Sequence, residues 1–306
     1  MNKKVAILKS NLNSFEKFYS NILKKYVEVF DLYKPKNKIG AGFLYMHFKL
    51  NLPFKELWYG SWKNKLVNYN IVILFDSGAS FEVINTLRKN NPNARLIFWN
   101  WNTGLPKEKV DLLKKLNYEV WSFDKKECLD YGFSYNNQFY EDIKIEENNI
   151  KYDLLFVGKD KNRLKILLQL KEKYFDKLNL SYKFVVRKTE KYKDKKLNKY
   201  LQYNSIEYKK LLVLISKSRC IIDLVKEGQE GITIRVLESV FYNKKLITNN
   251  KSIKSYDLYD SNNIFIIDED TDFDNFMKKP YKKIDDKIMD KYRSETWIKN
   301  FNIKYN

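Results

Sequence analysis

Cysteine and glycine are scarce in this sequence, and both shortages restrict what the protein can be. There are two cysteines among 306 residues, and Cys220 stands inside the apolar run CIIDLV, where a buried, reduced thiol is expected. A reducing cytoplasm fits that state. The nine glycines include no Gly-x-Gly-x-x-Gly motif after a predicted strand, which argues against a dinucleotide-dependent oxidoreductase.

Long apolar runs are also missing. The beginning of the chain, MNKKVAILKS, is basic but has only four consecutive apolar residues, too few for the core of a signal peptide. No run approaches the roughly 18 apolar residues of a membrane-spanning helix. We therefore expect a cytoplasmic protein that would meet a membrane only as a peripheral protein, at the cytoplasmic face of the inner membrane.

Apolar and charged residues are both plentiful. The chain is 44% hydrophobic and 31% charged, which is typical of a folded globular protein, and its length allows two domains with a core each. The formal net charge of +20 would attract phosphates, anionic lipids or nucleic acid. Abundant lysine, asparagine, tyrosine and isoleucine could equally reflect an AT-rich genome.

Short apolar runs alternate with helix-like segments in both halves of the chain, which predicts two α/β domains with parallel sheets. A polar segment at 141–153 marks the boundary between a Rossmann-like N-terminal domain, 1–145, and a Rossmann-like C-terminal domain, 150–284. An amphipathic helix within 285–306 could pack back on the first domain. The expected strands are KKVAIL, YNIVILFD, ARLIFWN and YEVWSFD, then YDLLFVG, YKFVV, CIIDLV, KKLITN and NIFIID.

Two such domains facing each other would leave a cleft at the carboxyl ends of their strands, where open parallel sheets bind ligands. The stretch GQEGITIRVLES follows the strand CIIDLV at such a position. Its glycines allow a tight turn, and a helix beginning near Ile232 would offer backbone N–H groups to a phosphate. Arg235 and Glu238 lie one turn apart on that helix. A nucleotide needs this combination of a cation for its diphosphate and a carboxylate for its ribose.

The residues EGITIRVLE resemble the Glu-x7-Glu motif of the GT-B glycosyltransferases, which take sugars from nucleotide donors. The resemblance implies that Glu238 binds the ribose and that Glu230, as a catalytic residue, faces the donor sugar or its diphosphate. Many members have glycine in place of Thr233 and proline in place of Arg235. Arg235 would then be either an added diphosphate contact or a partner of Glu238. The string from Ile221 to Asn250 is also similar to bacterial enzymes that build capsule and lipopolysaccharide.

A second motif, LLFVGKDKNRLKIL, places basic residues where a strand gives way to a helix. In GT-B enzymes the corresponding loop lies beside the diphosphate, and KFVVRK would end on the same rim. The resemblance therefore implies a donor site made of Gly158, Lys159, Arg163, Arg187, Lys188, Gly231, Ile232, Thr233, Arg235 and Glu238.

In this family the N-terminal domain holds the acceptor and, in inverting enzymes, supplies a base. Asp76 ends the strand IVILFD and is one candidate, although a turn or helix-cap role explains it equally well. His47, the single histidine, is the second candidate because its ordinary pKa suits proton transfer near neutrality. Trp58, Trp99 and Trp101 could stack on acceptor sugars or belong to the core.

The resemblance implies a glycosyltransferase that moves a sugar from a nucleotide-sugar donor to an oligosaccharide or lipid-linked acceptor in bacterial surface polysaccharide biosynthesis. No metal or other cofactor is expected, because helix N-termini and basic side chains can stabilise the departing diphosphate. An anionic inner-membrane surface would be a further partner. Nucleic acid is not expected, although a basic nucleic-acid-binding protein is the alternative that the charge and the aromatic content allow. Retention or inversion stays open.

Overall fold

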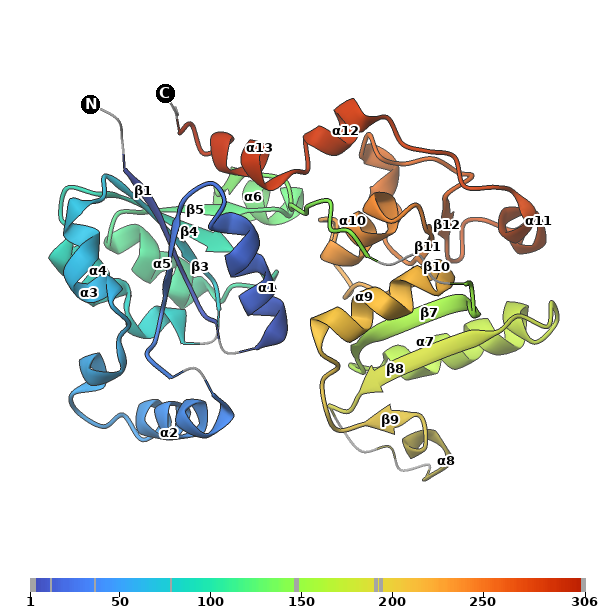
Figure 1. Cartoon of the computed structure of the whole chain (residues 1–306), viewed down its shortest axis with the longest axis horizontal. Helices are drawn as coiled ribbons and strands as arrows, with labels where there is room; N and C mark the ends of the chain where they lie inside the picture. Colours follow the sequence, from blue (N-terminus) through green and yellow to red (C-terminus); the bar gives the residue numbers. More distant parts are fainter. Residues whose placement is uncertain are drawn as a thin grey trace. The chain divides into compact units, whose positions relative to one another are not determined.

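The computed structural model describes residues 4–11, 13–35, 37–77, 79–145, 149–189, 192 and 195–303. The chain forms two compact α/β units (Figure 1). Unit 1 comprises Met1–Asn137 together with Ser294–Asn306, and unit 2 comprises Gln138–Arg293. The sequence placed this division between 145 and 150, a few residues later, and suggested that a helix within 285–306 packs back on the first domain.

Unit 1 is built on a six-stranded parallel sheet with the strand order β2-β1-β3-β4-β5-β6. Four of these strands coincide with the apolar runs of the first half. The other two are short and only partly apolar, which is why the sequence did not reveal them. The strands are β1 (Val5–Lys9), β2 (Glu28–Asp31), β3 (Ile71–Phe75), β4 (Arg95–Asn100), β5 (Tyr118–Ser122) and β6 (Ser134–Tyr135).

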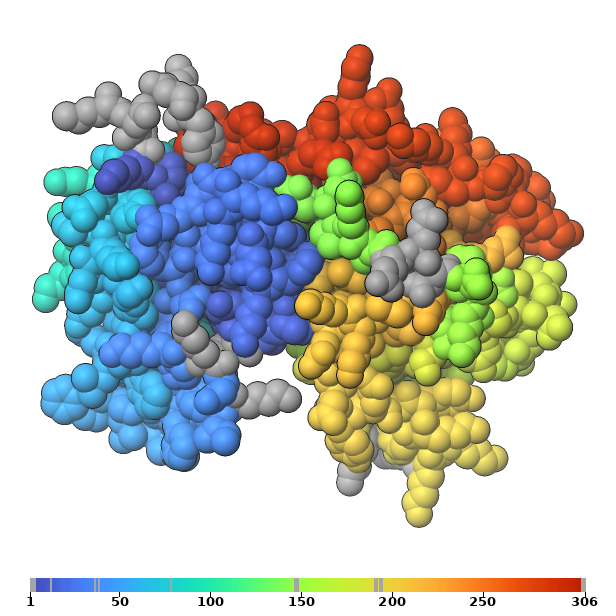
Figure 2. Space-filling view, in the orientation of Figure 1, coloured from blue at the N-terminus to red at the C-terminus, as the bar shows by residue number. Residues whose placement is uncertain are grey.

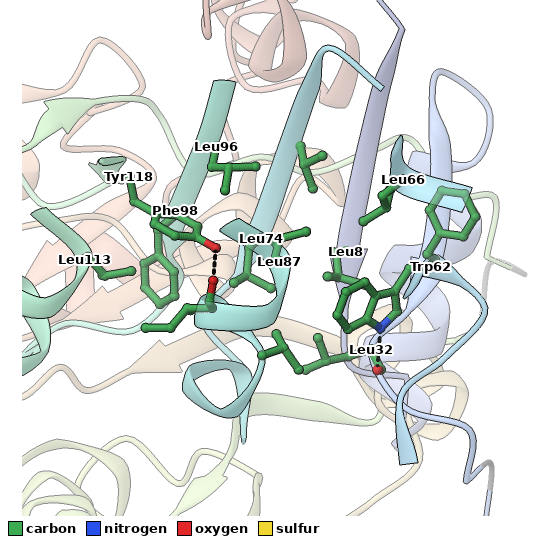
Figure 3. Packing of buried hydrophobic residues seen from close by; sticks show 14 of the residues in the cluster. Leu8, Leu32, Trp62, Leu66, Leu74, Leu87, Leu96, Phe98, Leu113 and Tyr118 are labelled. Carbon is green, nitrogen blue, oxygen red and sulfur yellow. Dashed lines mark hydrogen bonds between the residues drawn. The ribbon is translucent and has the colours of Figure 1, made fainter. Parts of the chain in front are cut away.

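Both faces of this sheet are buried, because side chains alternate along each strand and helices cover both sides. Leu74 of β3 and Phe98 of β4 belong to one core cluster, shown in Figure 3. Trp62 lies at its edge and donates its indole N–H to the Leu32 carbonyl over 2.9 Å. The helices of unit 1 are α1 (Ser14–Leu23), α2 (Lys38–Lys49), η1 (Lys55–Trp58), α3 (Trp62–Lys65), η2 (Leu66–Asn68), η3 (Ser80–Glu82), α4 (Ile84–Asn90), α5 (Lys107–Lys115), α6 (Lys125–Tyr131) and α13 (Ser294–Lys299).

The alternate residues of the same strands face α13, which comes from the end of the chain. Trp297 of α13 has no exposed surface and lies 5.5 Å from the ring of Phe75 and 5.3 Å from that of Trp99. Asn136 donates a hydrogen bond to the Trp297 carbonyl over 2.9 Å. This late segment therefore completes the core of unit 1.

Unit 2 contains a second six-stranded parallel sheet, with the order β12-β11-β10-β7-β8-β9. Numbered within the unit, the order is 6-5-4-1-2-3, the arrangement of the Rossmann fold. The order reverses between β7 and β10, and ligands of such sheets bind at that switch point. The strands are β7 (Tyr152–Lys159), β8 (Tyr182–Arg187), β9 (Leu201–Gln202), β10 (Ser218–Asp223), β11 (Lys245–Thr248) and β12 (Ile264–Ile266).

Helices cover both faces of the second sheet as well. On one face, leucines of α7 and Phe175 share a core with β7 and β10, and α9 and α10 contact β10 on the other. The single helix expected within 285–306 is interrupted at Tyr292 and Arg293, where Tyr140 donates its backbone N–H to the Tyr292 carbonyl. The helices of unit 2 are α7 (Arg163–Leu170), the π-helix η4 (Lys171–Phe175), α8 (Lys195–Asn198), α9 (Tyr208–Ser216), α10 (Ile234–Phe241), η5 (Lys251–Ser255), α11 (Phe273–Lys278) and α12 (Asp286–Asp290).

Candidate functional site

A pocket of about 690 Å³ opens in unit 2, and it is lined by three segments. They are the turn from β7 to α7 (161–163 with Ile166), the loop between β10 and α10 (225–230), and the residues after β11 (249–252). Each segment follows the carboxyl end of a neighbouring strand of the sheet. The pocket therefore lies at the switch point, where the strand order predicts a ligand.

The turn from β7 to α7 is held by a buried carboxylate. Asp160 is 2% exposed, and its Oδ1 accepts hydrogen bonds from the Leu164 N–H over 3.1 Å and from the Tyr192 hydroxyl over 2.9 Å. Lys161 and Asn162 adopt left-handed backbone conformations, with φ of 44° and 67°. Such conformations are uncommon outside glycine. This fixed turn presents Lys161 to the pocket.

Gly158 precedes that turn at a place where a side chain would not fit freely. A Cβ there would lie 3.0 Å from Cζ of Phe156 and 3.7 Å from Nη1 of Arg163. The guanidinium of Arg163 in turn donates a hydrogen bond to the Lys159 carbonyl over 3.3 Å. Arg163 thus reaches back across the end of β7 while also lining the pocket.

Several cations crowd the carboxyl end of β7. Partial burial lowers the pKa of Lys161, and the neighbouring charges of Lys159, Lys226 and Arg163 lower it further. The pKa of Lys159 is lowered in the same way, by burial first and then by Arg187 and Arg163. Because like charges that repel are relieved by an anion placed among them, this cluster suits a phosphate group.

The first turn of α10 is closed by its own cap. The Thr233 Oγ1 accepts hydrogen bonds from the backbone N–H groups of Arg235 (3.1 Å) and Val236 (3.4 Å), and the hydroxyl donates to Asp223 Oδ2 over 2.8 Å. Burial raises the pKa of the Asp223 carboxyl, an effect that Thr233 and two nearby arginines oppose. The sequence suggested that the start of this helix would offer N–H groups to a phosphate; Thr233 already occupies those of Arg235 and Val236.

Glu238 and Arg235 form an ion pair inside unit 2. Glu238 has no exposed surface, and its other carboxylate oxygen accepts a hydrogen bond from the Tyr208 hydroxyl over 2.7 Å. Burial raises the pKa of the Glu238 carboxyl, whereas Arg235 and Tyr208 act to lower it. The sequence allowed Arg235 to be either a diphosphate contact or a partner of Glu238, and the structure shows it as the partner of Glu238. It does not place either residue in the lining of the pocket.

The other expected donor residues divide between the pocket and its surroundings. Glu230 lines the pocket, and its carbonyl accepts a hydrogen bond from Asn250 over 3.2 Å. Gly231 and Ile232 follow it but are buried.

Arg187 and Lys188 stand at the end of β8, outside the pocket lining. Arg187 donates to the Ser205 hydroxyl over 2.6 Å, and Lys188 lies 3.2 Å from the Tyr203 hydroxyl. These contacts tie both residues to the segment that follows β9.

Several residues of the site escaped the sequence analysis. Asn249 and Asn250 follow β11 directly, Asn249 as the last residue of the run KKLITN. They brace the loop after β10, since the Asn249 amide exchanges hydrogen bonds with the backbone of Val225 over 2.8 and 3.2 Å. Their position after a strand was a usable signal. For Tyr208 the sequence contains no comparable signal, because its partner Glu238 lies 30 residues away on another helix.

In unit 1, Asp76 follows β3 at the switch point between β1 and β3. Its side chain is partly exposed and accepts a long hydrogen bond, 3.4 Å, from Asn102. Burial raises the pKa of the Asp76 carboxyl, whereas Asn102 and Lys109 act against that rise. His47 lies on α2, where its Nε2 is 2.8 Å from the Pro53 carbonyl. That bond ties the end of α2 to the next loop.

The three tryptophans expected to bind an acceptor differ in exposure. Trp99 has no exposed surface and packs against Trp297 and Phe301, so the structure places it in the core and leaves no face for a sugar. Trp101 and Trp58 are partly exposed. The ring of Trp101 lies 4.9 Å from that of Phe75.

Two further observations concern the residues that the structure describes. Among them, no group of three or more His, Cys, Asp or Glu side chains is placed to hold a metal ion. Within the same part of the chain, every helix is too short or too polar to cross a bilayer.

Comparisons of sequence find no match to this chain, whereas comparisons of structure find several. No protein-family model matches the sequence, and no curated protein matches it significantly. AviGT4, a glycosyltransferase involved in avilamycin A biosynthesis, is similar in structure with a TM-score of 0.62 at 11% identity, covering 98% of this chain and 96% of AviGT4. The Anabaena protein Alr3699/HepE, solved with UDP and glucose, has a TM-score of 0.59 at 8% identity over 98% of each chain.

The structure of TarM, from S. aureus, is a further match. Its TM-score is 0.51 at 16% identity, with 76% of this chain covered. The match spans 54% of TarM, about half of its length. Taken together with the two six-stranded parallel sheets, these similarities confirm the predicted α/β fold of the GT-B type.

Proposed function

We propose that this chain is a nucleotide-sugar-dependent glycosyltransferase that binds the diphosphate of its donor in the pocket of unit 2. The observation that carries the proposal is the crowding of Lys159, Lys161, Arg163 and Lys226 at the carboxyl ends of β7 and β10. Glu227 and Glu230 line the same pocket, but the charged groups that shift the pKa of Lys161 are all cations, and a nucleoside diphosphate would place negative charge among them. The complex of HepE with UDP and glucose supports a donor of this class.

The same cations would assist the chemical step. When the bond between sugar and diphosphate breaks, negative charge grows on the departing phosphate oxygen, and donors fixed beforehand stabilise that charge best. Lys161 and Arg163 are held by the β7–α7 turn and fill this role. We propose that these side chains neutralise the leaving group without a metal ion, while Glu230 at the opposite wall faces the sugar.

Glu238 requires a rearrangement to bind the ribose. Both of its oxygens are engaged by protein donors, and Arg235 also points toward the Val157 carbonyl of β7 at 3.5 Å. In this proposal Arg235 leaves Glu238 for the diphosphate, and the freed carboxylate then accepts hydrogen bonds from the ribose hydroxyls.

For the acceptor, we propose an oligosaccharide or lipid-linked glycan of a bacterial surface polysaccharide, brought to the enzyme at an anionic inner-membrane surface. A TarM mutant was solved with fondaparinux, α-GlcNAc-glycerol and UDP, which supports a carbohydrate ligand beside the nucleotide. Asp76 takes the proton of the acceptor hydroxyl, because its partly exposed carboxylate and raised pKa suit a general base.

Thermal unfolding with and without nucleotides tests the donor site. A ligand at 100 times its dissociation constant stabilises the folded state by about 2.7 kcal/mol, so the preferred member of UDP, TDP, GDP and CMP should raise the melting temperature. The double variant Lys161→Ala/Arg163→Ala should lose this shift. The variant Lys177→Ala/Lys183→Ala removes two exposed lysines of the same unit and should keep it.

Two outcomes would speak against the proposal. An equal shift in both double variants would mean that the nucleotide binds elsewhere. No shift with any nucleotide, together with salt-dependent binding of random oligonucleotides, would instead favour a nucleic-acid-binding protein.

A further inference from the structure

Helix α2 has apolar side chains on two opposite faces. Leu44 and Phe48 point inward and join the core of unit 1, with 0% and 9% of their surface exposed. Ile39, Phe43 and Met46 repeat at i, i+4 and i+7 on the outer face and are 74%, 56% and 53% exposed. A helix on the surface of a globular protein normally carries polar residues on its outer face. The outer face of α2 instead carries these three apolar residues.

The outer face of α2 continues into the following loop and η1. The residues Leu50, Leu52, Phe54 and Leu57 are 61%, 43%, 76% and 69% exposed. Eight of the fourteen exposed large hydrophobic residues in the described part of the chain thus fall between 39 and 57. We call these eight the α2–η1 surface; they are Ile39, Phe43, Tyr45, Met46, Leu50, Leu52, Phe54 and Leu57.

The most exposed of these side chains, Phe54, has a strained backbone. Its φ is 63°, a left-handed value that bulky residues rarely adopt because it costs energy. Phe54 nevertheless turns a whole aromatic ring to solvent. Figures 1 and 2 show α2 at the end of unit 1, with its outer side uncovered by the sheet and the other helices of that unit. Single exposed apolar residues are common, but a concentration of them in one short segment, such as that between 39 and 57, is typical of an interaction surface.

Positive charge accompanies the apolar residues. Between Leu32 and Phe75 the only acidic residue is Glu56, which forms an ion pair with Lys63. A second lysine, Lys55, pairs with Glu82 over 2.7 Å. The lysines in this part of the sequence stand at 34, 36, 38, 49, 55, 63 and 65.

We propose that the α2–η1 surface binds an anionic phospholipid bilayer. Apolar side chains on one face of a helix enter the boundary between headgroups and acyl chains, and flanking lysines reach the lipid phosphates with their flexible stems. A second copy of the chain is a poorer partner, because two such surfaces would bring together lysines that outnumber the neighbouring carboxylates, Glu56 and Glu82, which already pair with Lys63 and Lys55. Nucleic acid would match the lysines but would leave the apolar side chains in water.

This inference names the surface through which the proposed enzyme would meet its membrane. It rests on the proposed function only in assuming that the membrane carries the acceptor. Vesicle binding requires neither a donor nor an acceptor. It can therefore fail while nucleotide binding succeeds, or succeed while nucleotide binding fails.

Co-sedimentation of the full chain with vesicles tests the proposal. We expect binding to phosphatidylcholine vesicles containing about a third phosphatidylglycerol, and weaker binding to phosphatidylcholine alone. The variant Phe43→Ser/Phe54→Ser should reduce the partition coefficient by about tenfold or more, since two large apolar groups no longer enter the bilayer. Lys49→Ala should reduce it by about fivefold, an effect that added salt removes.

The control is Leu129→Ser/Val213→Ser, which replaces two apolar residues that are 85% and 45% exposed outside this surface and should bind vesicles like the parent. Circular dichroism and a cooperative thermal unfolding transition without nucleotide confirm that each variant is folded. Equal binding by the two double variants would overturn the proposal. It would also be overturned if the parent formed a concentration-dependent dimer that Phe43→Ser/Phe54→Ser abolished, without binding vesicles.

Discussion

At the scale of single residues, some buried or half-buried charges have hydrogen-bond partners within the protein, and others have neighbours of the same sign. Lys9 is 3% exposed, and burial lowers its pKa to about 8. Its ammonium donates to the carbonyls of Ser10 and Glu16 and to the Ser20 hydroxyl, over 2.9, 2.6 and 3.1 Å. We therefore regard Lys9 as structural. Lys161 differs, because the charged groups that shift its pKa are all cations, and a ligand of opposite charge would stabilise them.

The choice between the two candidate bases is tested by substitution and pH. Asp76→Asn should lower kcat by about 10²- to 10⁴-fold, whereas His47→Gln should leave it nearly unchanged, because the His47 ring is engaged with the Pro53 carbonyl. A base acts in its deprotonated form. Since burial raises the pKa of Asp76, kcat/KM should rise with pH through a midpoint above that of an ordinary aspartate.

The same shift makes a prediction for stability. A carboxyl whose pKa is raised on folding holds its proton more firmly in the folded state, so it lowers the free energy of unfolding as pH rises above its unfolded pKa. Asp76→Asn should therefore leave the free energy of unfolding near pH 7 unchanged or raise it, as measured by urea denaturation.

The kinetic assignment has its own contrary outcome. A large loss of kcat in His47→Gln, with normal activity in Asp76→Asn, would make His47 the base.

At the scale of secondary-structure elements, α10 depends on one side chain for its beginning. Thr233 caps two backbone N–H groups and also donates to buried Asp223. The Thr233 hydroxyl accepts and donates hydrogen bonds at the same time. This gives threonine a structural role at a position where the Glu-x7-Glu motif that it resembles often has glycine.

Removal of this cap has a defined cost. Thr233→Ala should lower the free energy of unfolding of unit 2 by about 1 to 2 kcal/mol, measured by urea denaturation, because both the cap and the donor to Asp223 are lost. Thr233→Ser keeps the hydroxyl and should cost much less. If the two variants were equally destabilised, the methyl group rather than the hydroxyl would matter, and the capping role would be wrong.

Elements with strong apolar patterns were predictable, and those made by tertiary contacts were not. The run YNIVILFD became β3 because all five of its strand residues are buried. The two-residue strands β6 and β9 carry no apolar pattern. The expected final helix of 285–306 is divided into α12 and α13. The division falls at Tyr292 and Arg293, where the Tyr292 carbonyl accepts a hydrogen bond from the Tyr140 N–H.

At the scale of the whole molecule, the end of the chain belongs to the unit in which the chain begins. Trp297 packs with Phe75, Trp99 and Phe301, so the core of unit 1 contains residues from both ends of the sequence. The residues that line the candidate donor pocket all belong to unit 2.

This division predicts separate consequences for stability and binding. Trp297→Ala should lower the free energy of unfolding of unit 1 by about 3 to 5 kcal/mol, because it opens a large cavity. The nucleotide-induced stabilisation of unit 2 should persist. Lys299→Ala, on the exposed side of the same helix, serves as the control. Calorimetry would contradict the prediction if Trp297→Ala destabilised both units equally.

The sequence by itself determined the two α/β halves, most of their strands and the regions of basic and acidic residues that follow those strands, because apolar periodicity and strand-end position are local properties. It also predicted Arg163 and Glu230 at one site, and both line the pocket of unit 2. Only the tertiary structure decided that Glu238 is enclosed by Arg235 and Tyr208 and that Trp99 lies under α13. These outcomes depend on which distant segments come into contact, and that is a consequence of how the whole chain buries its apolar surface.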